Sequence, residues 1–203
     1  TMTAIGKDDK IKVLDSVNYP HSLGIFYTSV TQFLGFPKYG DEYKVMGLAP
    51  YGQPKYKDLI IKELIDLKDD GSFRLNMKYF NYATGLTMTN DKFSNLFGKK
   101  PREPEKELLT QFHMDIAASV QAVTEEIVLK LTSSISQETK IKNLCMAGGV
   151  ALNCVANGKI LKKNIFENIW IQPAAGWSQI FSKIFFFNIF PFATQFKATP
   201  PAI

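Results

Sequence analysis

Apolar residues recur at regular intervals along this chain, and their spacing predicts the order of its strands and helices. Two short apolar-rich runs, at 1–5 and 11–14, are separated by a segment with one glycine and two aspartates, a pattern typical of a β-hairpin. The strongest signal covers 109–131, where apolar residues step by three and four and predict one long helix. Several charged residues of this segment fall off the apolar stripe: Asp115, Glu125, Glu126 and Lys130.

Three shorter helices are predicted in the first third of the chain. Residues 22–34 carry apolar side chains at helical spacing, and Ser22 is a suitable N-cap. Residues 41–49 are predicted as a second helix capped by Asp41. Residues 57–67 are predicted as a third helix, which ends before a turn rich in aspartate and glycine.

The remaining elements alternate between strand and helix. Aromatic residues at 72–105 indicate strands or an aromatic-lined loop. Residues 143–147 read as a buried strand, 150–162 as a helix and 166–171 as a further strand. This order predicts an α/β domain with a mixed sheet and one long helix.

The composition is ordinary for a globular protein, with 45% apolar and 21% charged residues. The formal charge of +5 is spread over short pairs of basic residues, which argues against nucleic-acid binding. A mild positive excess suits a small anionic ligand such as a nucleotide or an acyl phosphate. A solvated surface explains the same excess equally well.

The cysteines and the aromatic C-terminal stretch bear on the compartment. Cys145 and Cys154 lie in apolar surroundings without metal-type spacing, so we interpret each as a free thiol that packs as a small hydrophobe. Free thiols fit a reducing cytoplasm. The aromatic stretch at 180–192 is too short to span a bilayer and contains Lys183. We therefore expect a cytoplasmic protein without a membrane segment.

The glycine pair Gly148-Gly149 carries the clearest chemical signal, because it lies between a predicted strand and a predicted helix. Glycines there allow a ligand to approach the backbone, and the helix N-terminus presents N–H groups and a positive dipole end. Asn153, in the expected first helical turn, can bind a ribose, a base or a phosphate. The alternative is that the pair only lets the chain change direction.

Glu42 and Lys44 form a second candidate at the start of a predicted helix. The lysine could pair with a phosphate, and the carboxylate could hold ribose hydroxyls. The alternative is that both side chains face water. The two histidines, His21 and His113, are too far apart in sequence to form a metal site by spacing, so no metal ligand and no catalytic residue is assigned.

Four motifs, in order, resemble the NodU-type and tobramycin-type O-carbamoyltransferases. They are PHSLGIFY at 20–27, GF followed by KVMGLAPYG within 35–52, GGVALNC at 148–154 and NIWIQPAAG at 168–176. The similarity is nearly continuous over 1–176.

The resemblance implies a fold of the actin, Hsp70 and sugar-kinase superfamily, which is RNase H-like. In that family a second domain makes carbamoyladenylate from carbamoyl phosphate and ATP. The domain represented here then passes the carbamoyl group to an acceptor hydroxyl, commonly on a sugar, beside a divalent metal ion such as iron. It further implies that nucleotide contacts come from Gly148, Gly149, Val150 and Asn153, with Glu42 and Lys44 as further candidates.

The chain also departs from the family. The family's histidine motif would lie upstream of Thr1, and after Gly176 an expected aspartate, a metal ligand in the family, is replaced by Trp177. We therefore divide the chain into a partial N-terminal carbamoyltransferase domain at 1–176 and a non-family tail at 177–203, which a frameshift or out-of-frame read-through would explain. We expect the chain alone to be inactive.

Two alternatives to a carbamoyltransferase are considered. One is an inactive truncated remnant with at most weak nucleotide binding, and the other is a sugar-kinase-like ATPase. The acceptor remains open, as does the oligomeric state. Aromatic residues of the segment 71–104 could line a sugar pocket, or they could be ordinary packing: Phe73, Tyr79, Phe80 and Tyr82.

Overall fold

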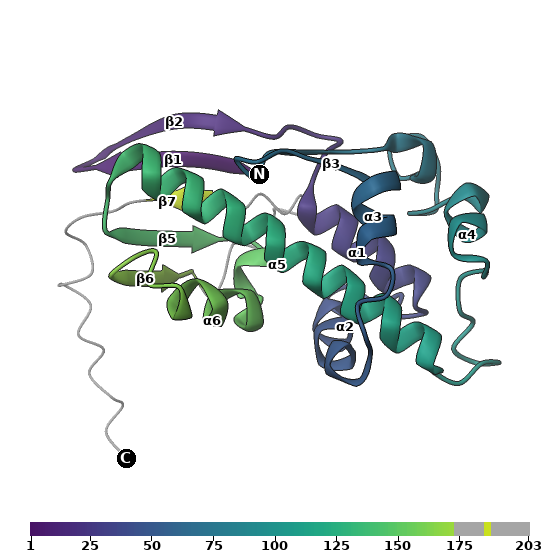
Figure 1. Cartoon of the computed structure of the whole chain (residues 1–203). Coiled ribbons are helices and arrows are strands. Elements are labelled where there is room, and N and C mark those ends of the chain that lie inside the picture. Colours follow the sequence, from purple (N-terminus) through teal and green to yellow (C-terminus); the bar gives the residue numbers. More distant parts are fainter. Residues whose placement is uncertain (173–184, 188–203) are drawn as a thin grey trace, which may run out of the picture.

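A computed structural model describes residues 1–172 and 185–187 and shows an α/β arrangement (Figure 1). The strands, in chain order, are β1 (Met2–Lys7), β2 (Lys10–Ser16), β3 (Ile65–Leu67), β4 (Phe73–Leu75), β5 (Asn143–Ala147), β6 (Asn168–Ile171) and β7 (Phe185–Phe187). The α-helices are α1 (Leu23–Phe33), α2 (Glu42–Leu48), α3 (Lys57–Glu63), α4 (Asp91–Phe97), α5 (Gln111–Thr139) and α6 (Cys154–Lys162). Short 3-10 turns are η1 (Ala49–Tyr51), η2 (Met77–Tyr79) and η3 (Val150–Leu152).

The main sheet is mixed, as the sequence predicted, with strand order β2-β1-β7-β5-β6. The hairpin β1–β2 is antiparallel, and β5 and β6 are parallel. Strand β7 lies between them, parallel to β1 and antiparallel to β5. It belongs to the segment interpreted as a non-family tail. The rest of that tail, including Trp177, lies outside the described residues.

Helix α5 organises the fold. Figure 1 shows it crossing the sheet and continuing into the end of the molecule where α1, α2, α3 and α4 gather. The apolar stripe is fully buried at Ile116, Val120, Val123 and Ile127, which confirms the predicted long helix. Leu109 precedes the helix, which begins after Thr110.

The polar side of α5 differs from the prediction. Asp115 and Glu125 were expected to lie off the buried stripe, yet they are only 3% and 6% exposed. The reason is that α5 has neighbours on more than one side: α1, α2, α3, η1 and α6 all contact it. A helix enclosed in this way buries polar residues as well as apolar ones, and these must then be paired.

Helix α1 begins as predicted. The Ser22 hydroxyl accepts a hydrogen bond from the Ile25 N–H at 3.4 Å and caps the helix. Asp41, by contrast, precedes α2 without capping it. Its carboxylate accepts from the Lys38 N–H at 3.2 Å and pairs with Lys44 at 2.7 Å, so the predicted cap is wrong.

The predicted helix 57–67 is too long. Helix α3 ends at Glu63, and the following residues form β3, which pairs antiparallel with β4. In β3 the side chains alternate, with Ile65 buried and Asp66 exposed, so the strand period takes over once the chain can pair with β4.

The aromatic residues of 71–104 are largely core. Phe73, Tyr79 and Phe80 are at most 5% exposed, and Phe93 packs edge-on against Phe33 with ring centroids 5.0 Å apart. Ordinary packing, rather than a sugar pocket, accounts for these rings. In the described part of the chain, no helix combines the length and the apolar character that a membrane span requires.

The turn between β3 and β4 lies directly against α5, and this contact predicts a stability effect. Gly71 has φ +88°, and a Cβ there would collide with the backbone of Leu131, whose Cα would lie at 2.9 Å. Gly98 has φ +68° but open space around it. We expect Gly98→Ala to lower the free energy of unfolding by about 1 kcal/mol through backbone strain alone. Gly71→Ala should cost at least about 2 kcal/mol more, measured by urea unfolding. Equal losses would contradict the close approach.

A second prediction concerns acid stability. The Asp115 carboxylate accepts from Lys55 at 2.7 Å, from the Gln53 N–H at 2.9 Å and from Gln111 at 2.9 Å, and these bonds lower its pKa to about 2. A carboxyl with a depressed pKa in the folded state stabilises above its ordinary pKa and loses this contribution as pH falls from about 4 towards 2. Because Lys55 is exposed, we expect about 1–2 kcal/mol at neutral pH.

The matched variant is Asp115→Asn. Its deficit in free energy of unfolding relative to the native protein should be greatest near pH 7 and should shrink below about pH 4. A deficit that stays constant from pH 7 to pH 2 would show that the charge of Asp115 contributes nothing.

Candidate functional site

The glycine pair follows the buried strand β5 directly. Gly148 is buried and has φ +104°, a conformation that L side chains rarely adopt, whereas Gly149 is exposed and has right-handed helical angles (φ −58°, ψ −41°). Gly148 is therefore required by the backbone, and Gly149 is not.

The sequence predicted that a helix begins directly after the glycines, at residue 150, but α6 begins only at Cys154. Instead η3 intervenes, and its first hydrogen bonds run from the Ala151 N–H to the Gly148 carbonyl at 3.1 Å and from the Leu152 N–H to the Gly149 carbonyl at 3.2 Å. The N–H groups of Gly149 and Val150 have no hydrogen-bond partner among residues 1–172 and 185–187. Within the described residues, two adjacent backbone donors at the end of β5 are therefore unpaired.

Asn153 closes the turn as the N-cap of α6. Its Oδ1 accepts from the Ala156 N–H at 3.1 Å, and its side chain is buried. The same amide forms a reciprocal pair with Gln121 of α5: Gln121 Nε2 donates to Asn153 Oδ1 at 3.0 Å, and Asn153 Nδ2 donates to Gln121 Oε1 at 2.9 Å. The Asn153 side chain is thus bonded within the protein.

Gln121 extends this network to α1. The Tyr27 hydroxyl donates to Gln121 Oε1 at 3.0 Å, and Gln121 Nε2 also donates to Glu125 Oε1 at 2.8 Å. Burial, together with the negative charges of Glu125 and Glu42, raises the pKa of Tyr27 well above its usual range. The Tyr27 hydroxyl is therefore a permanent donor.

Glu42 and Lys44 point to different neighbours, because residues two apart on a helix do not share a face. Glu42 Oε1 accepts from the Thr28 hydroxyl at 2.5 Å, and its negative charge contributes to the raised pKa of Tyr27, the residue before Thr28. Lys44 pairs with Asp41 at 2.7 Å and lies over the Phe36 ring. The hydrogen bond to Asp41 raises the pKa of Lys44.

The structure thus brings together four of the six predicted residues, whereas Glu42 and Lys44 bond to Thr28 and Asp41 instead. The four are Gly148, Gly149, Val150 and Asn153, which share one turn. Helix α2 reaches the start of α6, where Cys154 Sγ lies 3.9 Å from Met46 Sδ. Lys44 makes no contact with the turn within the described part of the chain.

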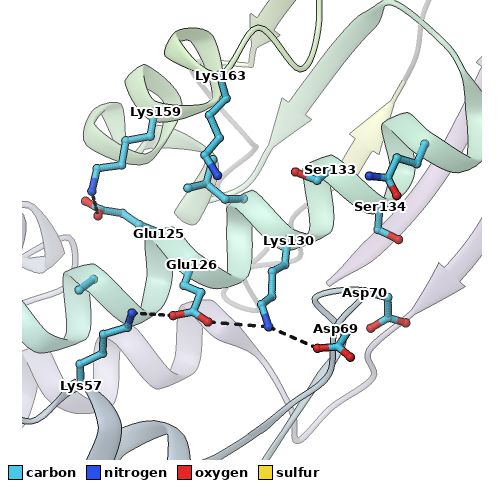
Figure 2. Close-up of a pocket in the computed structure, with 13 residues that line it drawn as sticks. Lys57, Asp69, Asp70, Glu125, Glu126, Lys130, Ser133, Ser134, Lys159 and Lys163 are labelled. Carbon is cyan, nitrogen blue, oxygen red and sulfur yellow. Dashed lines mark hydrogen bonds and ion pairs between the residues drawn. The ribbon is translucent and has the colours of Figure 1, made fainter.

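A groove of about 700 Å³ runs along α5 on the side where α6 and the β3–β4 turn approach it (Figure 2). Its charged groups largely neutralise one another: Lys57 pairs with Glu126 at 2.8 Å, Lys130 lies 3.8 Å from both Glu126 and Asp69, and Lys159 pairs with Glu125. The glycine turn does not line this groove. Glu125 and Lys159 connect the two, because Glu125 also binds Gln121.

The described residues contain no cluster of three or more His, Cys, Asp or Glu side chains that could hold a metal ion. Both histidines have structural partners: His21 Nδ1 accepts from the Leu75 N–H at 3.2 Å, and His113 Nδ1 accepts from the Thr110 N–H at 3.0 Å. The described residues therefore do not fit the metal that the resemblance implies.

Sequence reasoning missed Tyr27, Gln121 and Glu125. The available signal was the spacing of Gln121 and Glu125, four residues apart on one face of a long helix. Gln121 and Glu125 lie one turn apart and off the apolar stripe, and such a polar pair is compatible with a second buried face of the helix.

The two thiols should differ sharply in reactivity. Cys154 opens α6 and is exposed, whereas burial raises the pKa of the Cys145 thiol to about 11. We expect an aromatic disulfide reagent near neutral pH to modify the exposed Cys154 rapidly and Cys145 at least about a hundredfold more slowly, because Cys145 is buried and its raised pKa leaves little thiolate. Cys154→Ser should remove the fast phase and Cys145→Ser should not; the reverse would refute this assignment.

Comparison with known proteins identifies the family. Residues 1–179 match the family described as Carbamoyltransferase N-terminus. An uncharacterized protein of Synechocystis sp. is 62% identical over 160 residues, which cover 79% of this chain and 26% of that protein. Nodulation protein NolNO of Sinorhizobium fredii is 36% identical over 174 residues, covering 86% of this chain and 24% of that protein. Nodulation protein NolO of Bradyrhizobium diazoefficiens is 37% identical over 175 residues, covering 86% and 29%.

The chain therefore spans about a quarter of the length of these relatives. The match to the family covers most of the chain, and it includes the hairpin, α5 and the glycine turn. The resemblance that four sequence motifs indicated is confirmed, and the chain belongs to the NodU-type carbamoyltransferase family through its N-terminal domain.

Proposed function

We propose that this domain takes part in the transfer of a carbamoyl group from carbamoyladenylate to an acceptor hydroxyl, and that the Gly148–Asn153 turn holds the nucleotide phosphate. Carbamoyl phosphate and ATP would supply the adenylate, and a sugar hydroxyl is the proposed acceptor. Family membership supports the reaction class. The observation that carries the site is that the N–H groups of Gly149 and Val150 have no hydrogen-bond partner in the part of the chain that the structure describes.

The transfer requires hydrogen-bond donors that stabilise the AMP leaving group. The acceptor oxygen forms a bond to the carbamoyl carbon, the bond from that carbon to the phosphate oxygen breaks, and AMP leaves with the electron pair while the hydroxyl proton passes to a base. Negative charge grows on the phosphate oxygen during this step. Two backbone N–H donors near the positive end of α6 stabilise such charge without reorganising.

The other predicted residues take different parts in this proposal. Asn153 shapes the turn, because its side chain is bonded to Gln121 and to the Ala156 N–H. Glu42 uses one carboxylate oxygen for Thr28, and we assign its other oxygen to a ribose hydroxyl. Lys44 is held by Asp41 and would need to leave that pair to reach a phosphate.

We further propose that the domain has an actin-like ATPase fold. A mixed sheet with an antiparallel hairpin on one side, a parallel β5–β6 pair on the other and a long helix across it supports an actin-like ATPase fold. A nucleotide site at the carboxyl end of β5 agrees with the usual position of ligands in open α/β sheets.

The sharpest test compares Gly149→Asp with Gly149→Asn. Both side chains have nearly the same shape, and position 149 is exposed with ordinary backbone angles, so both variants should fold. The aspartate places a negative charge beside the two N–H groups. We expect it to raise the dissociation constant for ATP or AMP at least about tenfold relative to the asparagine variant, measured by calorimetry at low salt.

The control is the melting temperature of each variant without ligand, which should be the same within experimental error. For the native protein, nucleotide at a hundredfold excess over its dissociation constant should add about 2.7 kcal/mol of stability. If the native protein binds neither ATP nor AMP at millimolar concentration, the proposed function of the turn is refuted. Equal affinities of Gly149→Asp and Gly149→Asn for the nucleotide would show that the phosphate does not bind beside Gly149.

A further inference from the structure

The amide group of Gln121 is saturated with hydrogen bonds. It is buried, and each of its four hydrogen-bonding positions is used: Oε1 accepts from Tyr27 and Asn153, and Nε2 donates to Glu125 and Asn153. A buried amide with this full set of partners has one orientation. A flipped amide would set its oxygen against the Glu125 carboxylate.

The polarity of the pair is fixed at both ends. Glu125 is a carboxylate paired with Lys159, so it can only accept from Gln121. The Ala156 N–H can only donate, so it must face Asn153 Oδ1. Between these two groups the donors and acceptors of the Gln121–Asn153 pair can be arranged in only one way.

This arrangement bears directly on the glycine turn. Asn153 ends η3 and begins α6, so its side chain sets where the 3-10 turn stops and the helix starts. Gly149 and Val150, whose N–H groups have no partner among the described residues, lie four and three residues before it. No other side chain of α5 bonds to Asn153 in the described part of the chain.

We propose that Gln121 is a positioning residue that holds the Gly148–Asn153 turn in its nucleotide-binding shape, with its own orientation fixed by Glu125 and Tyr27. The role rests on the proposed nucleotide site. Gln121 itself touches no nucleotide: it acts through Asn153. Through Gln121, helix α5 bonds directly to the turn, and helix α1 bonds to it indirectly through Tyr27.

Two variants test the donors and acceptors separately. Gln121→Met keeps the length of the side chain and removes all four hydrogen bonds. Gln121→Glu keeps the shape and the acceptors but cannot donate, and it places a second carboxylate beside Glu125. We expect each to raise the dissociation constant for AMP at least about tenfold, with Gln121→Glu no weaker in effect than the apolar variant.

Ser119→Ala is the matched control for stability. Ser119 is also a buried polar residue of α5, and its hydroxyl accepts from the Tyr56 N–H at 3.0 Å without contacting the turn. It should lower the melting temperature while leaving the affinity for AMP within about twofold of native. A purely structural role for Gln121 would give the same pattern as Ser119→Ala, and that result would overturn the proposal.

A milder variant covers the case in which a Gln121 variant fails to fold. Tyr27→Phe removes only the hydroxyl that donates to Gln121 Oε1 and leaves the ring in place. We expect a roughly threefold weaker affinity for AMP and faster hydrogen exchange at the Ala156 amide, since the amide pair loses one of its supports. Native affinity together with native exchange at Ala156 would overturn the proposal.

The outcomes separate this role from the proposed function. Absence of AMP binding by the native protein refutes the nucleotide site and the Gln121 role together. Binding by the native protein that persists unchanged in folded Gln121→Met and Tyr27→Phe refutes the Gln121 role alone. Binding that is lost in step with faster exchange at Ala156 supports both.

Discussion

The burial of α5 on several sides constrains the rest of this structure. A polar side chain that is buried on such a helix is destabilising unless it is hydrogen-bonded, and several of these side chains are bonded by a neighbouring element. Asp115 binds the segment that precedes α3, Ser119 accepts from the backbone of Tyr56, and Gln121 binds Asn153 ahead of α6. These side chains occur in order along the helix: Asp115 and Ser119 hold the segment 53–56 ahead of α3, and Gln121 holds the start of α6. The apolar stripe drives the packing of α5, and the polar residues determine how its neighbours are placed.

Much of the fold could be predicted from the spacing of apolar residues. The hairpin β1–β2, helix α1 with its Ser22 cap, helix α5 and strand β5 all follow from it, because in each case one period dominates. The helix predicted over 57–67 was wrong because Leu64 and Ile65 fit both a helical and a strand period, and only pairing with β4 decides between them. The burial of Asp115 and Glu125 also could not be foreseen, since the sequence does not show how many elements surround α5.

The candidate site was predictable only in part. The glycine pair was found because Gly148 has a backbone conformation that other residues avoid, and that requirement leaves a trace in the sequence. The 3-10 turn after it leaves none, because residues 150–152 are compatible with either kind of helix. Gln121 was missed for a related reason. A glutamine acquires its role from Asn153, which is 32 positions away, and local patterns carry no information about that contact.

The amide network orders the Gly148–Asn153 turn during folding, so that a ligand would not have to supply the free energy of ordering it. A loop that is ordered only by its ligand loses part of the binding free energy to that ordering, whereas a loop fixed during folding does not. In this domain the hydrogen bonds of η3 start at Ala151, and the cap at Asn153 is fixed from α5, so the fold itself holds the backbone on the C-terminal side of Gly149 and Val150. Lys159 supplies the positive charge that the buried Glu125 requires. A series of contacts therefore runs from Lys159 at the edge of the groove through Glu125 and Gln121 to Asn153 in the turn. At each contact, the neighbouring group in the series fixes which atom donates and which accepts.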